Sequence, residues 1–219
     1  EFGFHEMIHE INESLRNIVK NQNSIYVYDF NQFVSKYGEK NIFDYKQFHI
    51  GDIQIAFNYI PYFAHELMSY VKPMFGINRK CIVLDLDNTL WGGVVGEDGF
   101  DGIELGQTPN GKSFVEFQKH LLSLWQQGII LAINSKNNFD DAMKVIRDHP
   151  DMILREKHFA SIQINWNDKA QFLKAISEEL NIGLGSIVYF DDDPVNQERI
   201  KQEIPEVLMA KLPEDPSQY

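Results

Sequence analysis

Four groups of polar residues in this chain have the types and spacing that phosphoryl transfer requires. They are Asp85-x-Asp87, Ser135, Lys169 and Asp191-Asp192. Clustered carboxylates repel one another unless a cation joins them, and Mg²⁺ takes oxygen ligands while keeping waters that a phosphate can displace. A carboxylate can then attack phosphorus while a hydroxyl and an ammonium group hold the phosphoryl oxygens. The set therefore predicts Mg²⁺-dependent phosphoryl transfer.

Each residue of the set has a predicted role. Asp85 ends an apolar run and is the candidate nucleophile, while Asp87 is the candidate acid and base that protonates the leaving oxygen and later deprotonates water. Ser135 and Lys169 are predicted to hold phosphoryl oxygens. The predicted metal ligands are Asp85, Asp87, Asp191 and Asp192. Weaker candidates for substrate binding are Asn88, Trp91, Lys136 and Asn137.

Each element of the set also has a purely structural explanation. Asp-x-Asp is common in turns, a serine after a strand is usually a turn residue, and a lysine early in a helix is usually solvated. Acidic residues before Pro194 could simply favour the positive end of the next helix. Because all four elements occur in one chain, each at a predicted strand end or helix start, we favour the catalytic interpretation.

Strands and helices that could position these residues alternate after residue 78. Apolar runs predict strands at 81–84, 129–133, 159–164, 186–190 and 207–209, and helices at 111–127, 140–148, 168–180 and from Pro194 onward. Asn138 and Asn167 are the predicted N-caps of the second and third helices. This alternation predicts a parallel sheet covered by helices on both faces, with ligands bound beyond the carboxyl ends of the strands.

Residues 1–78 are different in character, being rich in aromatic residues and histidine. Periodicity there predicts helices at 4–20, 31–37 and 61–71 and a short buried strand at 25–30. We therefore place a domain boundary near residues 76–80 and expect a smaller α/β segment before it.

Composition limits the classes of partner. The chain has 219 residues, a formal net charge of −12 and one cysteine, Cys81. The negative charge argues against nucleic acid and anionic membranes as partners, and no apolar run approaches the roughly 20 residues of a membrane span. A single cysteine excludes an internal disulfide and a cysteine-based zinc site, which fits a cytoplasmic location.

The four groups together resemble the motifs of the haloacid dehalogenase superfamily, and residues 79 to about 213 resemble its FkbH-like subgroup. The resemblance is carried by residues 80–99, Ser135-Lys136-Asn137, His149-Pro150, Asn165-Trp166 and Asn181-Ile182-Gly183-Leu184. It implies a Rossmann-like core without a large cap, with Asp85 as nucleophile and Asp87 as acid, base and backbone-carbonyl ligand of Mg²⁺. It also implies that Ser135 and Lys169 bind phosphate and that Asp192, alone or with Asp191, binds the metal.

FkbH-like proteins are associated with loading a glyceryl unit from a phosphorylated three-carbon acid onto an acyl carrier protein, with a thiol as a suggested way-station. Here Asn134 stands where members often have cysteine, and Cys81 at the start of a strand is expected to be a core residue. The first prediction is therefore hydrolysis of a small phosphorylated metabolite, a sugar phosphate or phosphorylated acid, through an aspartyl-phosphate. Transfer to an acyl carrier protein is the alternative, followed by a phospho-acceptor switch and an interaction module.

The resemblance also implies neighbouring domains. Residues 1–78 are predicted to be the end of an upstream hydrolase-like domain, 79–212 the catalytic domain, and 213–219 a linker to a further C-terminal domain. The glycine-rich loop 91–106 is predicted to be a mobile hairpin, a flap over the site or both, with Trp91 packing on substrate or shielding it from water.

Overall fold

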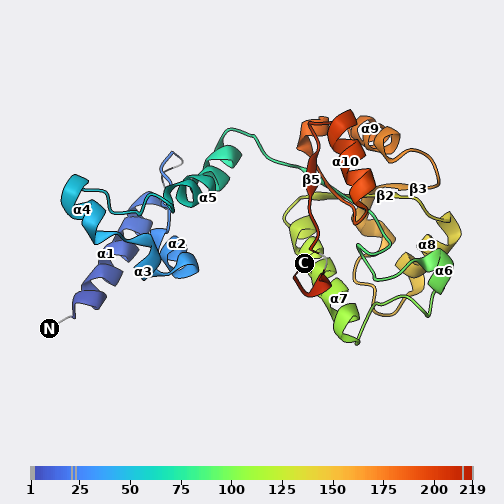
Figure 1. The fold of residues 1–219 in the computed structure, drawn as a ribbon, viewed down its shortest axis with the longest axis horizontal. Helices are drawn as coiled ribbons and strands as arrows, with labels where there is room; N and C mark the ends of the chain where they lie inside the picture. Colours follow the sequence, from blue (N-terminus) through green and yellow to red (C-terminus); the bar gives the residue numbers. More distant parts are fainter. Residues whose placement is uncertain (1–2, 21, 23, 214, 219) are drawn as a thin grey trace. The chain divides into compact units, whose positions relative to one another are not determined.

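The chain packs as two compact units in the computed structural model, which describes residues 3–20, 22, 24–213 and 215–218. Unit 1 covers Glu1–Ile77 and unit 2 covers Asn78–Tyr219. Figure 1 labels the helices of both units and the strands β2, β3 and β5 of unit 2. Within the described ranges, no helix is both long enough and apolar enough to cross a membrane.

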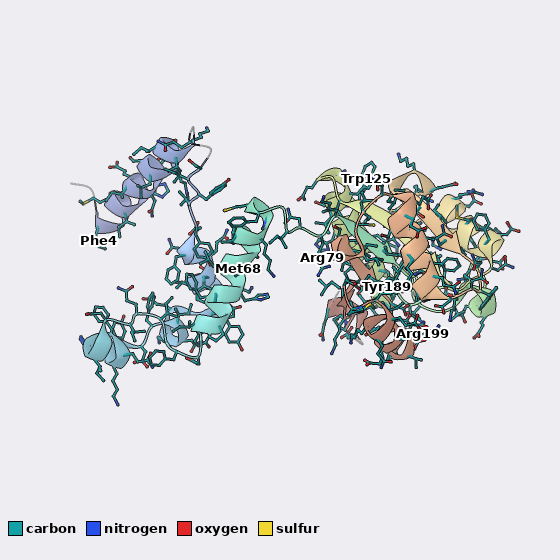
Figure 2. All side chains as sticks on the ribbon, turned by 90° about the horizontal axis from the view of Figure 1, so that it is seen from above. Phe4, Met68, Arg79, Trp125, Tyr189 and Arg199 are labelled. Carbon is teal, nitrogen blue, oxygen red and sulfur yellow. The ribbon has the colours of Figure 1, made fainter. Side chains whose placement is uncertain are left out.

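Unit 1 is helical in its described residues. Its helices are α1 (Phe4–Val19), α2 (Phe30–Tyr37), α3 (Glu39–Ile42), α4 (Tyr45–Gly51) and α5 (Ile60–Met74). Phe33 of α2 is fully buried, and its ring centroid lies 5.4 Å from that of Phe63 in α5. Figure 2 labels Met68 on α5 and Phe4 on α1, two apolar side chains that are substantially exposed. The helices predicted at 4–20, 31–37 and 61–71 are confirmed.

The strand predicted at residues 25–30 is wrong. The segment before α2 has no regular secondary structure, and Tyr26 within it is 63% exposed. Asp29 instead caps α2 by accepting a hydrogen bond from the backbone N–H of Asn31 at 3.1 Å. An apolar run becomes a strand only where a neighbouring strand satisfies its backbone groups, and here the acidic cap favours a helix start. The predicted α/β segment is therefore a helical one.

Unit 2 is built on a five-stranded parallel sheet with the strand order β3-β2-β1-β4-β5. Its strands are β1 (Cys81–Leu84), β2 (Ile130–Ser135), β3 (Phe159–Ile164), β4 (Ile187–Phe190) and β5 (Leu208–Ala210). Its helices are α6 (Val95–Asp98), α7 (Pro109–Gln126), α8 (Phe139–Asp148), α9 (Lys169–Glu179) and α10 (Pro194–Glu203), and 3-10 turns cover Glu156–His158, Leu184–Ser186 and Pro216–Gln218. The predicted α/β fold, a Rossmann-like parallel sheet flanked by helices, is confirmed.

Side chains of β1 alternate between two hydrophobic cores. Ile82 and Leu84 pack with residues of α7 and α8, whereas Cys81 and Val83 pack with residues of α9 and α10. Figure 1 shows α7 on the opposite side of the strands from α9 and α10. Because helices cover both faces, the whole strand is buried, which explains why its sequence is continuously apolar.

The order of the strands reverses at β1. From β1 the chain continues to β2 and β3 on one side, then crosses to β4 on the other side of β1 and ends at β5. The backbone N–H of Asp85 donates to the carbonyl of Phe190 at 2.9 Å, which holds the ends of β1 and β4 together. Ligands of open α/β sheets bind at such a switch point, so the fold delivers Asp85 and the residues after β4 to one binding position.

Two helix N-caps and the last turn of unit 2 can be compared with the predictions. Asn138 caps α8 as predicted, but Asp168 rather than Asn167 caps α9, accepting from the N–H of Ala170 at 2.8 Å. This cap makes Lys169 the first residue of α9. In the predicted linker 213–219, the turn Pro216–Gln218 packs against α7, unlike a free linker, and residues 214 and 219 lie outside the described residues.

Candidate active site

Asp85 lies at the carboxyl end of β1 and is 7% exposed. One carboxylate oxygen accepts a hydrogen bond from the backbone N–H of Leu86 at 2.7 Å, and the other accepts one from Nζ of Lys169. Burial raises the pKa of Asp85 to about 6, against the opposing effects of Lys169 and of a hydrogen bond with Ser135. The carboxylate is thus held by three groups on three different segments.

Asp191 follows β4 and is fully buried. Its Oδ2 accepts hydrogen bonds from Nζ of Lys169 at 2.7 Å and from the hydroxyl of Tyr189 at 2.6 Å, while Oδ1 accepts from the N–H of Asp193 at 2.9 Å. Burial lowers the pKa of Lys169, but Asp85 and Asp191 outweigh that effect and raise it, so the side chain stays cationic. Lys169 therefore bridges two carboxylates from neighbouring strands.

Asp192 differs from its neighbour in being exposed. Surrounding atoms still crowd its carboxylate, and this burial together with Asp191 raises its pKa, while a hydrogen bond with Asn88 opposes the change. Asn88 has a left-handed backbone conformation, with φ of 51°, and its Oδ1 accepts from the N–H of Gly93 at 2.9 Å. Asparagine tolerates this conformation better than most residues, so it can turn the chain tightly beside Asp192.

Asp85, Asp191 and Asp192 form a candidate metal site. One carboxylate oxygen from each lies within 4.8 Å of the others. Lys169 supplies one positive charge against three negative ones, so a divalent cation would balance the remainder. The donors are all oxygen atoms, which suits Mg²⁺. The residue types, spacing and charge of this cluster therefore fit that ion.

Asp87 is held by a different set of hydrogen bonds from those of Asp85 and Asp191. Its Oδ1 accepts from the indole N–H of Trp91 at 2.9 Å and from the backbone N–H of Val95 at 3.1 Å, and its Oδ2 accepts from the Asn137 amide at 2.8 Å. Burial raises the pKa of Asp87, and these hydrogen bonds oppose that rise. The carboxylate of Asp87 is not among the three that meet at the candidate metal site.

Trp91 anchors the glycine-rich loop to the core. Its side chain has no exposed surface, and Val95, Ile103 and Leu105 of the same loop are buried beside it. The predicted packing of Trp91 on substrate is therefore at odds with its burial, since its indole supports Asp87 from below the surface. These buried residues hold the loop on the core, whereas Glu97 and Asp98 of α6 are exposed.

Ser135 and its neighbours at the end of β2 complete the site. Ser135 is buried beside Asp85, whereas Lys136 is half-buried and Asn137 bonds to Asp87. Asn134 donates from its side chain to the backbone carbonyl of Lys169 at 2.9 Å and so holds the start of α9 against β2. Asn134, which stands where FkbH-like proteins often have cysteine, therefore has a structural contact in this fold.

Sequence reasoning missed Tyr189 as part of the site. Its hydroxyl donates to Asp191 and also lies 3.3 Å from the backbone carbonyl of Asn134. Burial and the nearby carboxylates raise its pKa well above the ordinary value, so the hydroxyl stays protonated. Figure 2 labels Tyr189 inside unit 2. Its position in the sequence could have indicated this role. Tyr189 lies two residues before Asp191, and the period-two alternation of a strand puts both side chains on the same face.

This geometry can be compared with known structures. The crystal structure of the N-terminal part of the protein BF1531 from Bacteroides fragilis, which contains a phosphatase domain and is complexed with Mg, is 33% identical to this chain. It aligns with a TM-score of 0.90 over 99% of this chain and 58% of that one. The chain is thus similar in sequence and fold to a protein that contains a phosphatase domain. The chain spans 58% of the length of that relative.

Solved structures of lower identity also align with part of this chain. A haloacid dehalogenase family enzyme from Bacteroides thetaiotaomicron, complexed with magnesium and inorganic phosphate, is 14% identical, with a TM-score of 0.42 over 62% of this chain and 95% of that one. The 3-deoxy-D-manno-octulosonate 8-phosphate phosphatase of Moraxella catarrhalis is 19% identical, with a TM-score of 0.37 over 67% and 78% of the two chains. Neither a protein-family model nor a curated protein matches the chain.

Proposed function

We propose that unit 2 hydrolyses a small phosphomonoester in a Mg²⁺-dependent reaction, through a phosphoryl group carried on Asp85. The observation that carries this proposal is the division of the acidic residues into two groups. Asp85 meets Lys169, Asp191 and Asp192, whereas Asp87 is held separately by Trp91, Val95 and Asn137. One carboxylate is thus placed to attack phosphorus and another to move a proton.

The first step is attack of the Asp85 carboxylate on phosphorus. A bond forms between a carboxylate oxygen and phosphorus while the bond from phosphorus to the leaving oxygen breaks, and Asp87 gives its proton to that oxygen. Lys169 and the Ser135 hydroxyl hold the phosphoryl oxygens and offset their charge. The raised pKa of Asp87 favours the protonated form that this step needs.

The second step returns the enzyme to its starting state. Asp87, now a carboxylate, takes a proton from a water molecule as the water oxygen bonds to phosphorus. The bond between phosphorus and Asp85 breaks, so the carboxylate is regenerated and inorganic phosphate leaves. A bound Mg²⁺ would act as a Lewis acid that neutralises phosphoryl charge.

We assign the two acidic residues after β4 to different tasks. Both oxygens of Asp191 are already engaged, by Lys169 and Tyr189 on one side and by Asp193 on the other. Asp192 is exposed, and one of its carboxylate oxygens lies within 4.8 Å of those of Asp85 and Asp191. We therefore propose Asp192, the exposed member of the pair, as the direct metal ligand beside the attacking carboxylate of Asp85, whereas the fully buried Asp191, whose Oδ2 accepts from both Lys169 and Tyr189, positions Lys169. The backbone-carbonyl role of Asp87 remains part of the proposal.

Acyl transfer to a carrier protein, as in FkbH-like proteins, remains the alternative proposal. Cys81 is fully buried, and burial raises the pKa of its thiol to about 12, which argues against a thiol way-station. FkbH-like membership, a cytoplasmic location and further domains after residue 212 stay proposals as well. The similar BF1531 structure is itself the N-terminal part of a longer protein, which supports the last of these.

The test is phosphate release by the full chain from a panel of phosphomonoesters, with no carrier protein present. We expect release that requires Mg²⁺ and that falls at least about 1,000-fold in kcat/KM with Asp85→Asn, because the attacking group is removed. Glu97→Gln, a charge change at an exposed residue of α6, is the matched control. Release that persists in Asp85→Asn, or that appears only when an acyl carrier protein is added, would refute hydrolysis through Asp85.

A further inference from the structure

A cavity opens directly beside the proposed catalytic groups. It has a volume of about 290 Å³, and Asn88 and Asp192 of the candidate active site form part of its wall. The remaining lining residues are Gly92, Gly93, Glu104, Phe114, Leu212, Pro213 and Pro216. Small-molecule sites are typically about 300–1,000 Å³, so this cavity suits a small leaving group.

The walls of the cavity are fixed by backbone contacts and core packing. Gly92 and Glu104 exchange two backbone hydrogen bonds, of 2.8 and 3.0 Å, and a side chain at Gly92 would meet Phe114 at 2.9 Å. Leu212 packs against the core beneath, and the turn Pro216–Gln218 contacts α7. Glu104 is therefore held at a defined place on the rim by its own backbone, with its side chain exposed.

The charged residues that line the cavity are all acidic. Glu104 and Asp192 both carry carboxylates, and none of the described lining residues is Lys, Arg or His. A bound Mg²⁺ would use Asp192, which leaves Glu104 facing the leaving group without a positive partner on this wall. A carboxylate on the substrate would meet a like charge there, whereas hydroxyl or ammonium groups could donate hydrogen bonds to Glu104.

We infer that this cavity is the leaving-group subsite and that Glu104 selects its occupant. The preferred substrates are phosphomonoesters whose alcohol portion offers hydrogen-bond donors and bears no carboxylate, so phosphorylated acids are rejected. This inference rests on the proposed phosphatase function. It narrows the substrate class, since the acidic lining of the cavity favours a sugar phosphate over a phosphorylated three-carbon acid.

The test uses two substrates of equal carbon skeleton, glycerol phosphate and phosphoglycerate, which differ in a hydroxymethyl group and a carboxylate. With Mg²⁺ present, we expect wild-type kcat/KM to favour glycerol phosphate by roughly tenfold or more, as expected for two like charges a few ångströms apart near a protein surface. Glu104→Gln should reduce that ratio several-fold, and Glu104→Lys should reduce it further. Glu97→Gln, which changes a carboxylate outside the cavity, should leave the ratio as in wild type.

An aryl phosphate separates failure of this inference from failure of the phosphatase function. If either three-carbon ester is turned over too slowly, both are compared as competitive inhibitors of aryl phosphate hydrolysis. A wild-type preference for phosphoglycerate, or a ratio that Glu104→Gln and Glu97→Gln change equally, would overturn the selecting role of Glu104 while leaving hydrolysis in place. If the wild-type protein hydrolyses none of the three esters, the proposed function and this inference fall together.

Discussion

Unit 1 and unit 2 differ in what they bury. Among the described residues, every buried polar or charged side chain belongs to unit 2, including Asp85, Lys169 and Asp191, whereas the buried side chains of unit 1 are those of Phe33, Ile42 and Ala56. Burying a charge is costly unless it is paired and hydrogen-bonded, so proteins keep such groups where function needs them. The comparison places the proposed catalytic groups in unit 2.

The same contrast distinguishes the aromatic residues of the two units. In unit 1 the rings of Phe33, Tyr37 and Phe63 pack on one another. In unit 2 Trp91 and Tyr189 use their polar atoms to hold Asp87 and Asp191. Buried Trp and Tyr usually find such partners, and here the partners are the proposed catalytic carboxylates and their supports.

After the loss expected from Asp85→Asn, the next largest effects come from the two adjacent acidic residues after β4. Asp192→Asn should lower Mg²⁺-dependent kcat/KM by roughly 100-fold or more, because a metal ligand is lost, and should remove the rise in Tm that Mg²⁺ produces in wild type. Asp191→Asn should instead destabilise unit 2 by about 3 kcal/mol in the absence of metal, because the buried cation Lys169 loses a partner. Thermal unfolding with and without Mg²⁺ measures both effects.

The matched control for this pair is Asp101→Asn, an exposed carboxylate in the loop between β1 and α7. It should change neither the Tm nor its response to Mg²⁺. Our division of tasks would be contradicted if Asp191→Asn removed the Mg²⁺ response and Asp192→Asn kept it. It would also be contradicted if both variants unfolded alike in the absence of metal.

A substitution in the core of unit 1 is expected to have a smaller effect on activity. Phe33→Ala should destabilise that unit by about 3–5 kcal/mol, because a large buried ring is removed. We expect kcat/KM for phosphate release to stay within twofold of wild type under conditions where unit 2 is folded. Leu121→Ala in the core of unit 2 is the counterpart, with an expected cost of about 2–5 kcal/mol and a loss of active protein near its lowered Tm.

Unfolding followed by calorimetry, together with phosphate release at each temperature, separates the two units. If Phe33→Ala abolished release while unit 2 remained folded, unit 1 would have a part in catalysis that its buried residues do not indicate. That result would contradict the claim that unit 2 alone carries out the proposed reaction.

Much of unit 2 could be predicted from the sequence because its signals are local. The apolar run that ends in Asp85 fixes β1 and the place of the proposed nucleophile, and Asn138 marks the start of α8 by its own side chain. The contacts that build the site are not local. Asp87 bonds to Asn137 and Lys169 to Asp85, pairs that are 50 and 84 residues apart.

Three features depended on tertiary packing that sequence patterns do not contain. The burial of Trp91 follows from the loop folding onto the core. The segment containing Tyr26 has strand-forming residues but pairs with no strand in the part of the chain that the structure describes, so β propensity alone gave the wrong element there. The position of Glu104 on the cavity rim follows from its backbone pairing with Gly92.

The most direct test of the central claim is to trap the phosphorylated enzyme. Asp87→Asn should still accept a phosphoryl group from an aryl phosphate, whose good leaving group needs little protonation, but should lose it slowly because no base activates water. After rapid acid quenching, peptide mass spectrometry should find one phosphoryl group, on Asp85. Phosphorylation at another residue, or steady release of phosphate from the wild type with no phosphorylated Asp85 in the variant, would contradict the account.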